Sequence, residues 1–168
     1  MLALSLAACR QDSAEAEPVT PENTRLLSPL GPASAEYDTP SLTSESERGE
    51  EGARNLLLAW ARAIEANRPD EAWTLFDTAA REQVPEEEFA SIFTGLREIS
   101  VAVPDGEMEG AAGSLYYMSQ ATITAMDADG RPVRLEGPVV LRRVNDVPGA
   151  SEEQLRWNIE HVELAAPK

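Results

Sequence analysis

Few residues of this chain have side chains that could act as nucleophiles or metal ligands. The sequence contains one cysteine (Cys9), one histidine (His161) and one lysine (Lys168, the last residue). One cysteine cannot form an intramolecular disulfide, and one Cys with one His cannot supply the usual ligands of a zinc site. The terminal lysine is in no position for a phosphate-binding loop or a Schiff base. We therefore expect no metal site, no cofactor and no catalytic residues of these kinds.

Two adjacent arginines are the next candidates for chemistry. If the strand that ends near residue 144 presents its odd-numbered residues to the helices, period-two alternation places Arg143 on that face and Arg142 on the opposite one. A buried guanidinium needs a carboxylate from the protein or an anionic ligand, so we predict ligand binding by Arg143, together with Tyr117 and Trp157. Arg142 is expected to pair with an acid such as Glu160. In the alternative, the strand ends before Arg143 and both arginines are solvated.

Composition limits the fold and the partners. The 168 residues, 42% of them hydrophobic, suffice for one domain of ordinary size. A net charge of -16 repels phosphate backbones, so we expect no nucleic-acid partner.

Residues 1–9, MLALSLAAC, form an apolar run with small residues before the cysteine. The sequence Leu6-Ala7-Ala8-Cys9 resembles a bacterial lipobox, which implies a signal-peptide remnant and acylation of Cys9 as the mature N-terminus. A basic n-region is missing, so we expect a start upstream or a trimmed chain. Arg10 after the cysteine implies outer-membrane sorting facing the periplasm, if the source is a Gram-negative bacterium. A cytosolic protein with an apolar N-terminus is the alternative.

Residues 10–52 are rich in Pro, Ser, Thr and Glu and carry one aromatic residue, Tyr37. Such a segment cannot bury enough apolar surface to offset its ordering entropy, so we predict a disordered acidic tether. In the alternative, Leu26, Leu27 and Leu30 form a short docking motif for a partner.

Residues 53–165 are predicted to form an α+β domain of three helices followed by a curved, four-stranded antiparallel sheet. The helices are indicated by apolar positions at helical spacing: Ala53, Leu57, Trp60 and Ile64; Ala72, Trp73, Leu75, Phe76 and Ala80 after Pro69; and Phe89, Ile92, Phe93 and Leu96 after Pro85. The strands are indicated around Ile99–Val103, Leu115–Met126, Val133–Val144 and Leu155–Leu164, with turns at Asp105-Gly106, Asp127–Gly130 and Pro148-Gly149.

This element order, with the Asp-Glu-Ala-Trp stretch at residues 70–73, resembles the cystatin-like, nuclear transport factor two-like (SnoaL-like) superfamily. The resemblance implies a cone-like fold with a pocket. Its members include ketosteroid isomerases, polyketide cyclases and scytalone dehydratases, beside many proteins that only bind or scaffold. We therefore expect a membrane-anchored lipoprotein with a non-catalytic domain that binds a ligand or a protein. The alternatives are an isomerase-, dehydratase- or cyclase-type enzyme and a self-associating structural module, with a homodimer through the sheet.

An enzyme of that fold needs a buried carboxylate or histidine that faces an oxyanion stabiliser. Only one of Tyr116 and Tyr117 can face inward, and we find no acid on an inward strand position. His161 lies near the end of the last strand, and a Ser-His-Asp triad would lack a nucleophile-elbow motif. The stretch Asp127–Gly130 resembles the start of a calcium loop but lacks the later ligands, so a hairpin turn is predicted there.

The anchor is directly testable. In a chain expressed from its full upstream start, Cys9→Ser removes the acylated thiol, so the protein should leave the membrane fraction and lose labelling by radioactive palmitate. Unchanged labelling would contradict lipidation.

Overall fold

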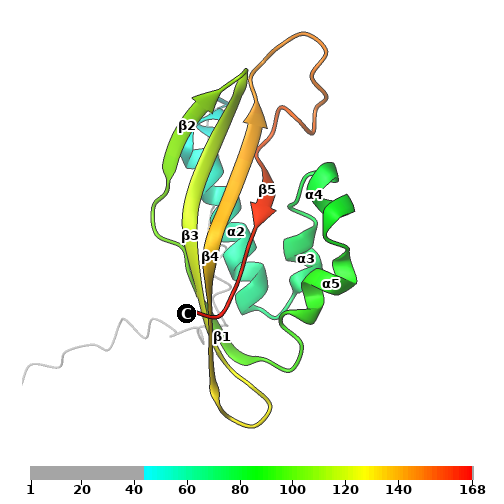
Figure 1. Ribbon diagram of the computed structural model, residues 1–168. Coiled ribbons are helices and arrows are strands. Elements are labelled where there is room, and N and C mark those ends of the chain that lie inside the picture. Colours follow the sequence, from blue (N-terminus) through cyan, green and yellow to red (C-terminus); the bar gives the residue numbers. More distant parts are fainter. Residues whose placement is uncertain (1–43, 168) are drawn as a thin grey trace, which may run out of the picture. The chain divides into compact units, whose positions relative to one another are not determined.

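The computed structural model describes residues 44–167. Cys9, the lipobox and residues 10–43 of the predicted tether lie outside the described residues. The elements, in chain order, are α1 Ser44–Arg48, α2 Glu50–Glu65, α3 Pro69–Trp73, α4 Thr78–Gln83, α5 Glu86–Ser91, β1 Arg97–Ala102, β2 Glu107–Ala111, β3 Ser114–Met126, β4 Pro132–Val144 and β5 Asn158–Val162. Figure 1 shows α2 along one face of the sheet and α3–α5 beside β5. The predicted α+β fold class is confirmed.

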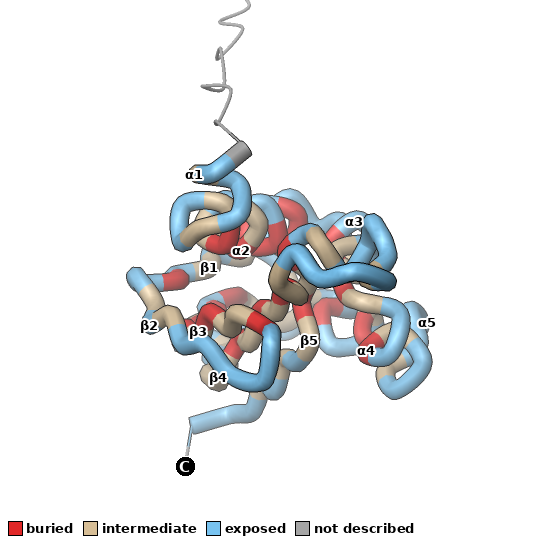
Figure 2. Tube along the Cα trace, turned by 90° about the horizontal axis from the view of Figure 1, so that it is seen from above, coloured by how far each residue is buried: buried red, intermediate tan, exposed pale blue. Residues whose placement is uncertain are grey.

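The long helix α2 supplies the apolar stripe that the spacing predicts. Its predicted inward residues Ala53, Leu57, Trp60 and Ile64 are at most 1% exposed. They pack in one cluster with residues of β3, β4 and β5. Figure 2 shows these buried stretches of α2 and of the sheet facing each other. Helical structure begins at Ser44, before the predicted domain boundary at residue 53.

The predicted second helix is wrong as one continuous element, because the chain divides into α3 and α4. Between them, Ile159 of β5 donates its N–H to Leu75 O at 2.9 Å and accepts from Asp77 N at 2.9 Å. Asp77 then begins α4 as its N-cap, with its carboxylate accepting from Ala80 N at 2.7 Å. The expected burial of Phe76 and Ala80 is confirmed, whereas Trp73 and Leu75 are only partly buried.

The third predicted helix is shorter than expected (α5), and two of the residues expected to be buried, Phe89 and Phe93, are buried. Phe89 contacts Phe76 and Phe93 edge to face, with ring centroids 5.1 and 5.3 Å apart. Burial of Ile92 is a wrong prediction, because Ile92 is 39% exposed. The regular helix ends at Ser91, so the helical spacing no longer decides which residues face inward.

The sheet has five strands rather than four, in the order β1-β3-β4-β5, with β2 also paired to β3. Both β1 and β2 run antiparallel to β3, β1 along its second half and β2 along its first. The Asp105-Gly106 pair is therefore an interruption within one edge, not the predicted chain reversal. The reversal occurs after β2 at Ala112 and Gly113, which have φ of 48° and 82°. Period-two alternation is the same whether the chain reverses at Gly106 or continues along the same edge, so it cannot distinguish the two arrangements.

The interruption between β1 and β2 is held by side chains from the core. The Tyr117 hydroxyl accepts the N–H of Gly106 at 2.7 Å, and Ser119 donates its hydroxyl to Pro104 O at 2.8 Å. Arg54 of α2 donates to the same carbonyl at 2.8 Å. A Cβ at Gly106 would lie 2.3 Å from Met118 O, so only glycine allows this close approach.

The two outer edges of the sheet are partly covered. At the β1 edge, Glu65 of α2 accepts the N–H of Val101 at 2.9 Å. At the β5 edge, the backbone N–H and C=O groups of Ile159 are hydrogen-bonded to Leu75 and Asp77. Beyond β5, Glu136 of β4 exchanges two backbone hydrogen bonds with Ala165. This crossing passes directly over Gly137, where any Cβ would collide with Glu163 O.

The hairpin between β3 and β4 confirms the turn predicted at Asp127–Gly130. The Asp127 carboxylate accepts the backbone N–H groups of Asp129 and Arg131, and Gly130 has a φ of 77°. These bonds, above all that from the Arg131 backbone, lower the pKa of Asp127 below its ordinary value. No helix in residues 44–167 is long and apolar enough to cross a membrane.

Removal of the Tyr117 hydroxyl tests whether it stabilises the interruption between β1 and β2. Tyr117→Phe keeps the buried ring but leaves the Gly106 N–H without its acceptor, which should lower the free energy of unfolding by about 1 to 2 kcal/mol. Tyr116→Phe, on the opposite face, should change it little. Denaturant unfolding checks both, and equal stabilities would contradict this role of Tyr117.

Candidate functional site

Arg143 faces the helices, as the alternation of β4 predicts, and its side chain is 5% exposed. The prediction that both arginines are solvated is therefore wrong. Arg143 donates to Asp146 at 2.7 Å and to Leu155 O at 2.8 Å. Its counter-charge comes from Asp146, in the loop of residues 145–157.

The other two predicted ligand-binding residues also bond within the fold. Tyr117 is fully buried and holds Gly106, while Trp157 is 5% exposed and donates its indole N–H to Gly49 O at 3.1 Å. Arg143, Tyr117 and Trp157 line neither of the two cavities described below. Ligand binding by them stays a prediction.

Arg142 lies on the opposite face, and its expected pairing with Glu160 is confirmed. Arg142 Nη1 lies 3.4 Å from the Glu160 carboxylate, with the two side chains 39% and 33% exposed. Its Nε donates to Ser114 Oγ at 3.2 Å, and its guanidinium lies over the Tyr116 ring. The pair is long and solvated, so it stabilises the fold by less than about 1 kcal/mol.

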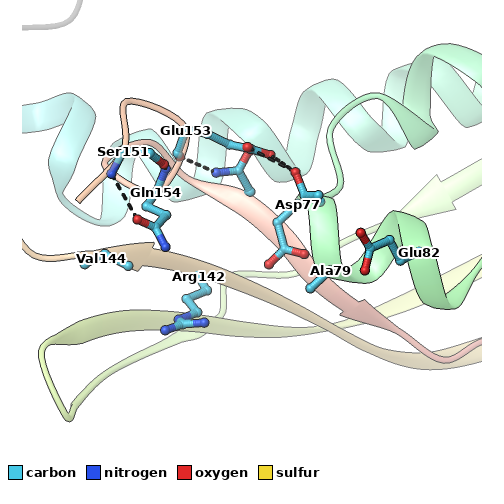
Figure 3. Close-up of a pocket in the computed structure, with 10 residues that line it drawn as sticks. Asp77, Ala79, Glu82, Arg142, Val144, Ser151, Glu153 and Gln154 are labelled. Atoms are coloured by element: carbon cyan, nitrogen blue, oxygen red, sulfur yellow. Dashed lines mark hydrogen bonds between the residues drawn. The ribbon is translucent and has the colours of Figure 1, made fainter. Parts of the chain in front are cut away.

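Arg142 also borders a cavity of about 430 Å³, which we call the α4 pocket. Its lining consists of Asp77, Thr78, Ala79 and Glu82 from the α4 side, Arg142 and Val144 of β4, and Ser151, Glu153, Gln154 and Asn158. Figure 3 shows these side chains around the space between α4, β4 and the 145–157 loop. A second cavity, of about 480 Å³, lies at the far end of the sheet between Glu98 and Arg134.

The helical wall of the α4 pocket follows from the cap of α4. As the N-cap, Asp77 is fixed at the start of the helix with Thr78 beside it. Thr78 and Arg81 both bond to Glu153, at 2.9 and 3.1 Å. Glu82 makes no ion pair with any residue of the described part of the chain.

The opposite wall is a turn that is closed by its own side chains. Ser151 and Gln154 bond reciprocally, each backbone N–H to the other's side-chain oxygen, at 3.0 and 3.2 Å. The Gln154 carbonyl accepts the N–H of Val144 at 2.8 Å, which joins the turn to the end of β4. Asn158 donates to Glu153 O at 2.8 Å and links the turn to β5.

The α4 pocket therefore combines three carboxylates with one guanidinium and several hydroxyl and amide groups. The Glu153 carboxylate is neutralised by Arg81, and Asp77 uses one oxygen for the helix cap. This set can bind charged and hydrogen-bonding groups. Sequence reasoning missed Asp77, Glu82, Glu153 and Gln154; the cap motif Asp77-Thr78 was the one available signal, hidden by the prediction of a continuous helix.

The sequence matches no protein-family model and none of the curated proteins. Solved structures do match. A nuclear transport factor 2-like superfamily protein from Salmonella enterica serovar Typhimurium aligns with a TM-score of 0.53 and 12% identity, over 71% of this chain and 91% of that one. A candidate aromatic ring hydroxylase from Novosphingobium aromaticivorans aligns with a TM-score of 0.50 and 13% identity, over 75% and 96%.

The fold is that of the nuclear transport factor 2-like superfamily. The resemblance inferred from element order is confirmed at the level of the fold. Identities this low carry no activity from these proteins to this chain. The buried polar or charged residues of the described range are Ser114, Ser119 and Arg143.

The contrast between the two arginines gives a stability test. Arg143→Met removes the donor of the Leu155 carbonyl and one of the two arginine partners of Asp146, so the free energy of unfolding should fall by about 2 kcal/mol. Arg142→Met, which loses a solvated ion pair and the 3.2 Å bond to Ser114, should cost less than Arg143→Met, about 1 kcal/mol. Urea unfolding measures both, and the reverse order would refute the assigned faces.

Proposed function

We propose that this chain is a membrane-anchored envelope lipoprotein whose domain binds a ligand or a protein segment without transforming it. The observation that carries the proposal is the α4 pocket, where polar groups from three separate segments of the chain converge. Its volume falls within the roughly 300 to 1,000 Å³ of small-molecule sites.

The chemistry of the pocket supports binding rather than turnover. Its lining holds no cysteine, histidine, lysine or tyrosine. Each of its three carboxylates lies on a residue that is half-buried or exposed, whereas general acids and bases are usually tuned by burial. Such a site can select a ligand by charge and hydrogen bonding.

The anchor completes the proposal. Acylation of Cys9 would hold the domain at a bilayer, in the outer membrane facing the periplasm, with residues 10–43 between the anchor and α1. A homodimer through the sheet is part of the same proposal. Register places Tyr116, Met118 and Val140 together on the face away from the helices, where each is only partly buried.

One observation favours the alternative of an isomerase-, dehydratase- or cyclase-type enzyme. Trp60 is fully buried in the cone, and its indole N–H has no hydrogen-bond partner among the described residues. A buried donor without an acceptor costs free energy, so a ligand oxygen that reached it would be stabilised. A substrate in the cone interior would bond there.

Filling the pocket tests the proposed function. Ala79→Phe adds a ring at an exposed lining position of α4, and Ala59→Phe adds the same ring at an exposed position of α2 outside the pocket. Native mass spectrometry of the protein purified from its own membranes should show a retained ligand or partner that Ala79→Phe loses and Ala59→Phe keeps. Equal retention by both variants would place binding elsewhere.

A further inference from the structure

We propose that the α4 pocket takes a small zwitterion, a molecule with an ammonium group and a carboxylate group at opposite ends. The inference rests on the proposed binding function and names its ligand class. It follows from which donor and acceptor atoms of the charged lining residues are already bonded within the protein and which remain available.

The ammonium end would lie against α4. Glu153 is excluded as a partner because Thr78 and Arg81 already bond to its carboxylate. Asp77 uses Oδ1 for the helix cap and keeps Oδ2 without a partner in the described part of the chain, where Glu82 has none either. Figure 3 shows the Asp77 and Glu82 side chains together on the α4 side, near Ala79. Two neighbouring carboxylates favour a primary ammonium group.

The carboxylate end would lie against β4. Arg142 has five N–H donors, and its bonds within the described residues are one to Ser114 at 3.2 Å and one to Glu160 at 3.4 Å. Both are long, so donors remain for a carboxylate, which a guanidinium binds with two parallel hydrogen bonds. Figure 3 shows Arg142 and Gln154 on the side opposite Asp77 and Glu82. The Gln154 oxygen is occupied by Ser151 N, so its amide N–H groups are free to donate.

Charge balance selects the zwitterion over singly signed ligands. A dianion would satisfy Arg142 but would meet Asp77 and Glu82 and the field of a chain with a net charge of -16. A dication would satisfy the two acids but would bring a positive charge to Arg142. A molecule with one charge of each sign meets an opposite charge at both ends. The few apolar side chains of the lining, Ala79 and Val144, match a short hydrocarbon link.

Three molecules with the same four-carbon chain separate these cases: 4-aminobutanoate, 1,4-diaminobutane and succinate. Isothermal titration calorimetry of the full chain in detergent, at low ionic strength, measures the affinity of each. We expect 4-aminobutanoate to bind at least about tenfold more tightly than either of the others, because it alone gains a charged hydrogen bond at both ends.

Isosteric variants assign the two ends. The double variant Asp77→Asn with Glu82→Gln keeps the helix cap and removes both charges. It should weaken the binding of 4-aminobutanoate by about tenfold and leave the binding of succinate unchanged or tighter. Arg142→Gln should weaken the binding of 4-aminobutanoate by a similar factor and leave the binding of 1,4-diaminobutane unchanged or tighter. Arg62→Gln and Glu86→Gln, exposed and outside the pocket, should change nothing. Thermal melts confirm folding, and Arg142→Lys, which keeps the charge without the planar fork, should lose less affinity than Arg142→Gln.

The inference is overturned if succinate or 1,4-diaminobutane binds as tightly as 4-aminobutanoate, or if the control variants lose as much affinity as the pocket variants. Its failure is distinct from failure of the proposed function. If none of the three molecules binds but Ala79→Phe still removes a native ligand, the zwitterion is wrong and pocket binding stands. If Ala79→Phe removes nothing and no molecule binds, both are wrong.

Discussion

A guanidinium that is withdrawn from water must find acceptors, and that requirement of Arg143 organises one end of the molecule. Its two bonds, to Asp146 and to the Leu155 carbonyl, both lead into the 145–157 loop. Asp146 also pairs with Arg48 of α1 at 3.0 Å, so one carboxylate joins the buried strand residue to the first helix. The same loop carries Ser151, Glu153 and Gln154 of the α4 pocket. The wall of a polar site is thus fixed by a buried charge on the other face of the sheet.

What the sequence predicted well depends on local periodicity. The stripe of α2 and the opposite faces of Arg142 and Arg143 follow from the periods of a helix and a strand, and the structure has both. The division at Asp77 and the interruption at Gly106 depend on bonds to Ile159 and Tyr117, which are distant in the chain. No local pattern reports those partners. The α4 pocket was missed for the same reason, because its walls come from segments that meet only in the fold.

The core and the candidate site make separate demands on this fold. Large side chains, among them Trp60, Phe76 and Tyr117, occupy the cone between α2 and the sheet. The α4 pocket instead uses residues beside β5 that are half-buried or exposed and contribute little to the core. Substitutions in its lining can therefore alter recognition with a small effect on stability. The unpartnered indole of Trp60 is the exception, a polar group placed inside the apolar cluster.

The covered strand edges bear on how such domains behave when crowded. An open strand edge is a template for pairing with another chain. Here residues 75–77 occupy the edge of β5, and Glu65 satisfies one N–H of β1. The short β2 carries Glu107 and Glu109 along its length, and their like charges would oppose each other if two copies aligned there. The domain is thereby protected against edge-to-edge aggregation, while the face of the sheet stays accessible.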